Sequence, residues 1–413
     1  MYERFYQHPK VNTIAFFSPL LSEATLFCRI KKVFSHTPMK IAVNTRMLLP
    51  SRLEGIGNFT HESFRRIVPS HPEHEFIFIF DRPFDSSFVY GNNVTPVVVF
   101  PPARHPLLTS YWNEIGVANV LRKYRPDVYV GTDGFFPLST KCKTLAVIHD
   151  LCFIHYPQDL PFLTSLYYRK MFPHFAKKAT RIAAVSEFTK SDVINKFHID
   201  EKKFDIVYNG ASENFTPLSV EEITKTRKQF SDSKPYFLFV GAIHQRKNIS
   251  NMLQAYDHFR KNYSSNVKML LAGNRRWWTE EMEKTFQSME YKNDVVFTGR
   301  VSLEDLCRIT ASALAMTYVS NFEGFGIPII EGMKAGIPVL TSNTSSMPEI
   351  AGQAALLCDP FNIESIADGM KQLASNESLR LDLIHKGNIR QAEFNWNKTA
   401  INLWHSIENT TGH

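Results

Sequence analysis

Two glutamates with seven residues between them, Glu323 and Glu331, flank a glycine-containing loop in the second half of the chain. The loop bends through the sequence GFG, and Pro328 soon after it indicates the start of a helix. Free backbone N–H groups at a helix N-terminus are suited to binding a phosphate, and carboxylates beside them can accept hydrogen bonds from sugar hydroxyls. Either glutamate alone is more typical of a helix end or a surface position. Together with the loop, the pair suggests a sugar nucleotide as the ligand.

Two adjacent positive charges, Arg246 and Lys247, lie shortly after the apolar run 236–240, which predicts a buried strand. Both side chains at the end of a strand can neutralise a diphosphate, although such a pair before a helix is usually a solvated surface feature. The chain contains no Asp-x-Asp sequence, on which metal-dependent sugar-nucleotide enzymes commonly hold a divalent ion. We therefore expect no metal, and expect Lys247, Arg246 and the helix that starts at Pro328 to stabilise the diphosphate.

His149 and Asp150 directly follow another apolar run, 143–148, which also predicts a strand. A histidine beside an apolar strand is more often a core residue whose hydrogen bonds are satisfied than a functional one. Ligands of parallel sheets, however, gather outside the carboxyl ends of the strands. The position of His149 and Asp150 is compatible with either role.

The elements that must position these residues are strands and helices that alternate from Met39 onward. This alternation predicts two doubly wound α/β units, one on each side of the turn at Asn209-Gly210. We expect strands of the first unit at 41–46, 75–81, 94–100, 127–130, 143–148, 181–186 and 203–208. We expect strands of the second unit at 236–240, 268–272, 295–298, 313–318 and 339–341. Helices are expected through 64–67, 107–124 and 167–178, and from Trp396 to Glu408.

Length and composition agree with a globular protein of two domains. The chain has 413 residues, of which 44% are hydrophobic and 21% charged. The formal net charge of +7 fits attraction to an anionic membrane face or to phosphorylated substrates, and we see no nucleic-acid-binding motif. The five cysteines are scattered without a CxxC pair, which argues against a disulfide framework or a zinc site and favours a reducing cytoplasm.

The first 38 residues, 1–38, form an extension that fits neither a signal peptide nor a membrane helix, because its apolar part carries Pro19, Ser22 and Glu23. Met39 begins a clean strand pattern. We therefore expect that Met39 is the natural start or that the extension is poorly ordered. An amphipathic segment that touches a membrane is the alternative.

The sequence EGFGIPIIEGMKAGIPVLTS, followed by PEIAG, resembles the donor-site signature of a large family. These are the retaining, nucleotide-sugar-dependent glycosyltransferases of the GT-B fold and the family-four type, also called glycosyl transferases group 1. The sequences GIGN, HDL, VSEFT and RKN resemble further segments of that family. The resemblance implies an α/β GT-B protein, with two Rossmann-like doubly wound domains facing across a cleft. The implied domains are an acceptor-side domain at 39–210, a nucleotide-sugar-binding domain at 211–395, and a C-terminal helix at 396–413 that crosses back to the first domain.

The resemblance also implies roles for individual residues. Glu331 binds the ribose of the nucleotide, Lys247 holds the diphosphate, and His149 reaches the transferred sugar. Many members have an arginine where this chain has Ala242. The implied catalytic residues are His149, Asp150, Glu323 and Lys247. The implied donor-binding residues are Arg246, Lys247, Arg300, Val301, Glu323, Gly324, Phe325, Gly326, Ile327 and Glu331, and the implied acceptor-side loop contains Gly55, Gly57 and Asn58.

The function implied by the resemblance is that of a metal-independent retaining hexosyltransferase. It would move a sugar, with mannose favoured, from a nucleoside-diphosphate sugar to a glycan or lipid-linked acceptor in surface polysaccharide synthesis. A GDP-sugar is favoured over a UDP-sugar, and the expected location is the cytoplasm or the inner face of the membrane. The alternatives are an epimerase or hydrolase of the same fold and a catalytically inactive binding subunit. Such a subunit would normally lack Glu323, Lys247 or Glu331, and all three are present.

Overall fold

The computed structural model of the chain describes residues 37–50, 53–103 and 105–412, and divides the chain into the units Met1–Pro38 and Met39–His413. The expectations for the N-terminal extension concern residues outside the described ones, apart from 37 and 38. Everything below concerns the unit that begins at Met39. Within the described part of the chain, no helix combines the length and the apolar character needed to cross a membrane.

The first sheet has seven parallel strands in the order β3-β2-β1-β4-β5-β6-β7. Val43 of the inner strand β1 lies opposite Phe78 of β2 and Val130 of β4, and all three side chains are buried. Burial on both faces explains why these strands are nearly continuous apolar runs. The strands are β1 (Lys40–Asn44), β2 (Glu75–Phe80), β3 (Val94–Val98), β4 (Val128–Gly131), β5 (Lys143–Ile148), β6 (Arg181–Ala184) and β7 (Phe204–Ile206).

One prediction for this sheet, the burial of its strand 94–100, was wrong. The run 94–100 was interpreted as a buried strand, but β3 lies at the edge of the sheet and exposes Thr95 and Pro96. A proline has no backbone N–H to donate to a neighbouring strand, and an edge strand has a side where no such donor is needed, so proline is tolerated there.

The predicted helix 107–124 is divided into three segments. Helices α3 (Pro106–Tyr111) and α4 (Ala118–Tyr124) are joined by the π-helix η2 (Trp112–Val117).

Helices cover both faces of the first sheet. They are α2 (Ile56–Ser70), α3, α4, α5 (Cys152–His155), α6 (Phe162–Lys178) and α7 (Glu187–Phe197). Short 3-10 turns accompany them at Ser86–Phe88, Pro157–Asp159 and Glu201–Lys203. The layer with α2 buries Phe59 and Phe64, whereas the layer with α3 and α6 buries Trp112 and Phe175.

The second sheet has six parallel strands in the order β10-β9-β8-β11-β12-β13. Its strands are β8 (Tyr236–Val240), β9 (Lys268–Ala272), β10 (Val295–Gly299), β11 (Ala315–Tyr318), β12 (Val339–Ser342) and β13 (Leu356–Cys358). The sequence did not predict β13, whose three residues at the sheet edge are too few to show a pattern. Helices and turns between the strands are α8 (Val220–Ser231), η5 (Gln245–Lys247), α9 (Ile249–Asn262), Arg275–Trp277, α10 (Glu280–Ser288), Lys292–Asp294, α11 (Leu303–Ala311), α12 (Ile327–Lys334), α13 (Met347–Ala351), α14 (Ile363–Ser375), α15 (Glu377–Arg390) and Gln391–Glu393.

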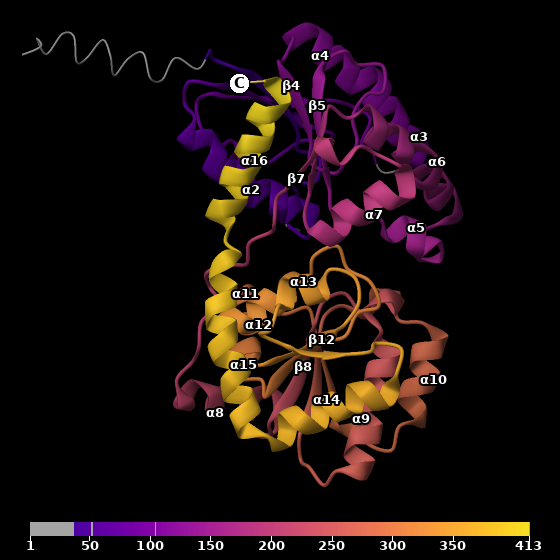
Figure 1. Cartoon of the computed structure of the whole chain (residues 1–413), viewed down its shortest axis with the longest axis vertical. Coiled ribbons are helices and arrows are strands. Elements are labelled where there is room, and N and C mark those ends of the chain that lie inside the picture. Colours follow the sequence, from indigo (N-terminus) through magenta and orange to yellow (C-terminus); the bar gives the residue numbers. More distant parts are fainter. Residues whose placement is uncertain (1–36, 51–52, 104, 413) are drawn as a thin grey trace, which may run out of the picture. The chain divides into compact units, whose positions relative to one another are not determined.

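The C-terminal helix α16 (Trp396–Thr411) packs against the first sheet and its helix α2 (Figure 1). Arg66 Nε donates to Asn397 Oδ1 over 2.8 Å at one end of this contact, and Lys143 Nζ donates to the Thr411 carbonyl over 2.7 Å at the other. The chain thus leaves the first sheet after β7, forms the second sheet, and ends on the first.

Candidate active site

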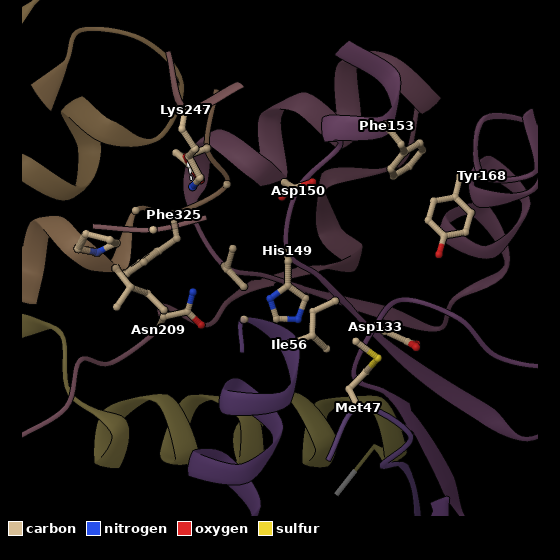
Figure 2. Close-up of a pocket in the computed structure, with 18 of the residues that line it drawn as sticks. Met47, Ile56, Asp133, His149, Asp150, Phe153, Tyr168, Asn209, Lys247 and Phe325 are labelled. Atoms are coloured by element: carbon tan, nitrogen blue, oxygen red, sulfur yellow. Dashed lines mark hydrogen bonds and ion pairs between the residues drawn. The ribbon is translucent and has the colours of Figure 1, made fainter. Parts of the chain in front are cut away.

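A cavity of about 500 Å³ lies where strands of both sheets reach their carboxyl ends (Figure 2). Residues that follow the strands of the first sheet line one side, and residues that follow β8 and β11 line the other. The lining residues are Arg46, Met47, Gly55, Ile56, Asp133, Phe135, His149, Asp150, Phe153, Tyr168, Phe172, Val185, Asn209, Val240, Gly241, Lys247, Tyr318, Glu323, Gly324, Phe325, Gly326, Ile327 and Pro328. The structure thus brings together the EGFG loop, Lys247 and the pair His149-Asp150, which are far apart in the sequence.

Glu323 forms the centre of a buried ionic cluster. Its Oε1 lies 2.5 Å from Lys247 Nζ, and its Oε2 lies 3.0 Å from Arg246 Nη1. Lys247 Nζ also donates to the Tyr318 hydroxyl over 2.8 Å, and Arg246 Nη1 donates to the Phe322 carbonyl over 2.7 Å. Two cations therefore share one carboxylate beside the EGFG loop.

The protonation states in this cluster follow from burial and charge. Burial alone would raise the pKa of Glu323, but the charges of Lys247 and Arg246 outweigh it and lower that pKa to about 2. Burial lowers the pKa of Lys247, while the attraction of Glu323 opposes that change. Glu323 is therefore ionised at neutral pH. The sequence suggested an exposed loop lysine, whereas Lys247 is largely buried because β11 and the EGFG loop pack around it.

His149 points into the middle of the cavity (Figure 2). Its Nε2 lies 2.9 Å from the Thr132 carbonyl, and because a carbonyl only accepts, Nε2 carries the proton and Nδ1 is an acceptor. Burial lowers the pKa of His149, so the ring is neutral at physiological pH. Phe59 of α2 meets the ring edge-on, with 5.1 Å between the ring centroids. The imidazole is thus oriented to accept a hydrogen bond through Nδ1.

The EGFG loop packs closely against the first sheet at Gly324. A Cβ atom at this position would lie 1.8 Å from the His149 carbonyl oxygen, so only glycine fits. The Gly324 carbonyl accepts hydrogen bonds from Ser186 Oγ over 2.7 Å and from Thr189 Oγ1 over 3.2 Å. These two hydroxyls belong to the VSEFT sequence, which therefore holds the loop in place.

A second contact joins VSEFT to the PEIAG sequence. The Glu349 carboxylate accepts from the backbone N–H of Glu187 over 2.8 Å and from that of Phe188 over 2.9 Å. These N–H groups are at the N-terminus of α7, where a carboxylate is favoured by the helix dipole. Glu349, on α13 after β12, thus links the two sheets beside the cavity.

Several lining residues were not predicted from the sequence. Arg46 follows β1 and Asp133 follows β4, and Arg46 Nε lies 2.5 Å from Asp133 Oδ2. Asn44 Nδ2 donates to the other oxygen of Asp133 over 2.9 Å. The rings of Phe135 and Tyr168 stand beside this pair. Arg46 ends the predicted strand 41–46 and Asp133 comes three residues after the predicted strand 127–130, so polar residues near strand ends were the signal that could have found them.

Other predicted residues lie outside the cavity lining. Gly57 and Asn58 lie in the first turn of α2, and Arg300 and Val301 follow the edge strand β10. Arg246 reaches the site only through its bond to Glu323. The remaining residue is Glu331, which the helix start expected at Pro328 would place in the first turn. It lies in the second turn of α12, because that helix begins at Ile327, directly after Gly326 with its φ of 97°.

Glu331 differs from Glu323 in its surroundings. No residue within the described ranges forms a hydrogen bond or ion pair with its carboxylate. The side chain is partly open to solvent, yet the protein around it is dense enough that burial raises its pKa to about 7. An unpartnered acceptor therefore lies close beyond the N-terminus of α12.

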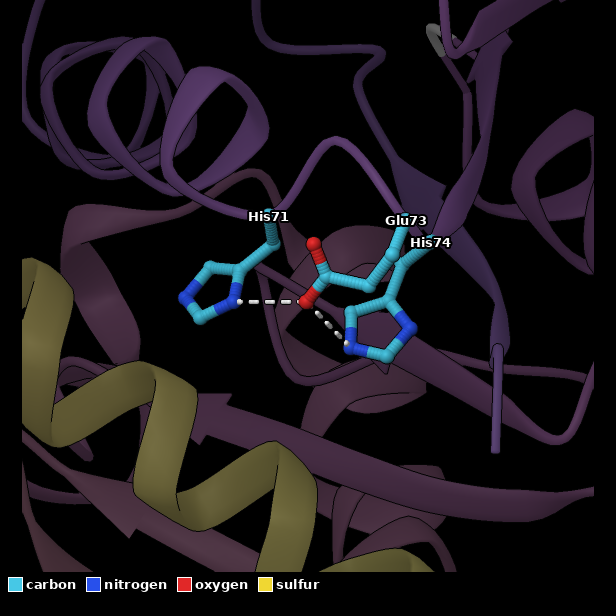
Figure 3. Close-up of side chains that lie close together, drawn as sticks. All are labelled: His71, Glu73 and His74. Atoms are coloured by element: carbon cyan, nitrogen blue, oxygen red, sulfur yellow. Dashed lines mark ion pairs between the residues drawn. The ribbon is translucent and has the colours of Figure 1, made fainter. Parts of the chain in front are cut away.

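A separate group of polar side chains, His71, Glu73 and His74, is the one cluster in the described part of the chain with spacing suited to a metal ion (Figure 3). One Glu73 oxygen lies 3.6 Å from His71 Nδ1 and 3.3 Å from His74 Nε2. However, His74 Nδ1 accepts the backbone N–H of Met39 over 2.9 Å, so the neutral ring carries its proton on Nε2. A metal ligand would need the opposite arrangement. The three residues belong to the turn between α2 and β2, and their protonation does not fit a metal.

Two protein-family models match the chain. The model for glycosyltransferase family 4 matches residues 55–215, and the model for glycosyl transferases group 1 matches residues 220–390. This chain belongs to the group 1 glycosyltransferases. The second match includes Lys247, Glu323 and Glu331, and the first includes His149.

Similar proteins agree with this assignment. The O-antigen chain mannosyltransferase B of Escherichia coli is 27% identical to this glycosyltransferase over 297 residues, which cover 71% of this chain and 78% of that protein. The O-antigen chain mannosyltransferase RfbU of Salmonella typhimurium is 26% identical over 259 residues, which cover 60% of this chain and 67% of that protein. The crystal structure of Anabaena HepE in complex with UDP and glucose matches 90% of this chain and 99% of its own, with a TM-score of 0.70 and 15% identity. The structural likeness confirms the predicted GT-B fold.

Proposed function

We propose that this glycosyltransferase moves a mannose-like sugar from a nucleoside-diphosphate sugar to a hydroxyl of a glycan or lipid-linked acceptor, with retention of configuration, in surface polysaccharide synthesis. The observation that carries the proposal is the cavity in which His149 faces the EGFG loop and its two cations. Two relatives named as O-antigen mannosyltransferases support the sugar and the pathway class. We place the reaction in the cytoplasm, on the inner face of the membrane.

The diphosphate of the donor would bind at the N-terminus of α12. The Ile327 N–H and the helix dipole favour an anion there, and Lys247 and Arg246 supply the charge. When the bond between the anomeric carbon and the phosphate oxygen breaks, the electron pair stays on that oxygen, and these groups stabilise it. Two cations beside a helix N-terminus support a reaction that needs no metal.

The transfer step uses the other side of the cavity. The acceptor hydroxyl attacks the anomeric carbon from the face that the diphosphate leaves, and its proton passes to the departing phosphate oxygen. His149 Nδ1 can accept a hydrogen bond from a hydroxyl of the transferred sugar, which would orient that sugar. We assign Asp150, whose Oδ1 accepts the Cys152 N–H over 2.8 Å, to the same site.

The nucleotide would extend along α12 toward β10. The partnerless carboxylate of Glu331 suits the two ribose hydroxyls, each of which can donate to it. Backbone groups at Arg300 and Val301 would contact the base. A GDP-sugar is the favoured donor and a UDP-sugar the alternative.

The acceptor would enter beside α2, along the loop that contains Gly55, Gly57 and Asn58. Gly55 and Ile56 line the cavity next to the Arg46–Asp133 pair. Charged groups can bind sugar hydroxyls, and the ring of Tyr168 offers an apolar face to a sugar ring. These features support a carbohydrate acceptor.

Measuring nucleoside diphosphate release from a panel of nucleotide sugars, with and without an oligosaccharide acceptor, tests this function. A transferase releases the diphosphate fast only when the acceptor is present. Equal release without acceptor would indicate a hydrolase. Donor binding without any release, in the presence of acceptor, would favour an inactive binding subunit.

A further inference from the structure

Helix α6 has two faces with different surroundings. Tyr168 and Phe172 line the active-site cavity on one face. On the other face and at the start of the helix, large apolar side chains are exposed to solvent: Phe162 is 78% exposed, Leu163 59% and Leu166 51%. One wall of the active site is therefore also part of the outer surface.

A groove of about 580 Å³ runs between α6 and the end of α7, and its charged residues are all basic. Arg169, Lys170 and Lys177 come from α6, and Lys196 and His198 come from α7 and the residue after it. No acidic residue lines the groove, and α6 contains neither aspartate nor glutamate. Within the described ranges, none of these five side chains forms an ion pair. Their charge is thus available to a ligand.

Helix α3 extends the apolar part of this surface. It contacts α6, and Ser110 Oγ donates to the Tyr167 hydroxyl over 3.1 Å between them. Leu107 is 75% exposed and Tyr111 49%, and Leu108 and Ile115 are also exposed. Seven of the sixteen exposed large apolar side chains of the described residues therefore belong to α3, the π-helix after it and α6.

We propose that this surface, formed by α3, α6 and the end of α7, docks on a bilayer that contains anionic lipids. The apolar side chains enter the boundary between headgroups and acyl chains, and the basic groove meets the lipid phosphates. Basic residues of one sign beside exposed apolar side chains complement a surface that combines negative phosphates with an apolar layer, which is the chemistry of an anionic bilayer. The same helix lines the active site, so docking brings the wall of the cavity to the membrane surface. This inference goes beyond the transfer reaction, and its test does not depend on activity.

The test is cosedimentation of the full chain with vesicles of phosphatidylcholine alone and with added phosphatidylglycerol. We expect binding to the anionic vesicles that weakens as salt screens the charges. Each basic side chain near such a surface is worth about fivefold in binding, so Arg169→Gln, Lys170→Gln and Lys177→Gln together should lower the partition coefficient by roughly a hundredfold. Phe162→Ser with Leu163→Ser should lower it by at least about tenfold.

Matched controls lie on the second sheet's helices and loops. Lys225→Gln, Lys284→Gln and Lys371→Gln together remove three exposed charges there, and Phe361→Ser with Ile389→Ser removes side chains that are each 63% exposed. The controls should bind vesicles like the unmodified chain. Residues 1–38 are the same in all variants, so the difference between the α6 variants and the controls reports on the α6 surface, and thermal melts show that each variant is folded.

Three results would overturn the proposal. The first is failure of the unmodified chain to bind anionic vesicles at low salt, and the second is binding of the α6 variants that is as tight as that of the controls. The third is a dimer of the unmodified chain in light scattering that Phe162→Ser with Leu163→Ser converts to a monomer, without vesicle binding. That outcome would make this surface a protein interface.

Discussion

The ionisation of Glu331 gives a prediction that separates a ribose ligand from a structural helix residue. Its carboxyl group has no partner in the described part of the chain, and burial raises its pKa from 4.5 to about 7. Ribose hydroxyls donate best to the ionised form. We therefore expect nucleoside diphosphate binding to strengthen as the pH rises through about 7, and expect Glu331→Gln to remove this dependence.

The magnitude follows from the shift in pKa. At about 1.36 kcal/mol per unit, ionising Glu331 in the folded chain costs about 3 kcal/mol more than in water. Below the folded pKa, affinity through the ionised form should fall about tenfold per pH unit. Above it, loss of a charge-assisted hydrogen bond worth about 1.5–3 kcal/mol should weaken binding to Glu331→Gln by roughly tenfold to a hundredfold.

Stability of the free protein should change in the opposite direction. Because the folded pKa of Glu331 is above its unfolded value, its contribution is full below 4.5 and is lost as the pH rises through about 7. A glutamine does not ionise. Glu331→Gln should therefore be the more stable protein above this range, by up to about 3 kcal/mol, and equal to the unmodified chain at low pH.

The assay is calorimetric titration with GDP and with UDP between about pH 6 and pH 8, with denaturant unfolding between about pH 4 and pH 8. Glu331→Gln serves as the control for the unmodified chain at each pH, because titration of the diphosphate affects both proteins equally. Parallel pH profiles and equal affinities for the two proteins would refute the assignment of Glu331 to the ribose. Equal stabilities above pH 7 would refute the raised pKa.

Four further predictions concern the cavity and its edges. Lys247→Ala should abolish transfer in a turnover assay, and it should also lower stability by about 1–3 kcal/mol, because Glu323 and the Tyr318 hydroxyl lose a hydrogen-bond partner while Arg246 still neutralises Glu323; full activity would remove Lys247 from the mechanism. Gly324→Ala should impair both folding and turnover, since its Cβ would meet the His149 carbonyl, and a melting temperature like that of the unmodified chain would contradict this contact. Glu349→Gln should lower stability by about 1 kcal/mol in denaturant unfolding, through loss of a charged cap on α7, and no change would deny it that role. Chelation with EDTA should leave turnover unchanged, whereas a loss that manganese restores would require a metal.

The sequence predicts the inner strands well, because strands buried on both faces must be apolar throughout. It does not distinguish an edge strand such as β3 from an inner one when the edge residues are also apolar. It also misses β13, which has too few residues for a pattern. Arg46 and Asp133 could each have been noticed near a strand end, but their ion pair could not be predicted, because they are 87 residues apart and meet only when β1 and β4 pair.

The donor side shows the same limit. The motifs identify Glu323, Lys247 and Glu331. They do not reveal that Glu323 and Lys247 neutralise one another, or that Glu331 has no partner in the described part of the chain. Those properties arise from packing across the second sheet. Spacing in the sequence reports which groups are present, whereas burial and pairing decide their charge.

The anomeric configuration of the product tests the central claim most directly. The donor that supports acceptor-dependent turnover is supplied with an oligosaccharide acceptor, and the new glycosidic bond is examined by NMR. The proposed mechanism predicts that the bond keeps the configuration of the donor sugar, that Lys247→Ala forms no product, and that product forms equally in EDTA. A product of inverted configuration would contradict attack from the face of the leaving diphosphate.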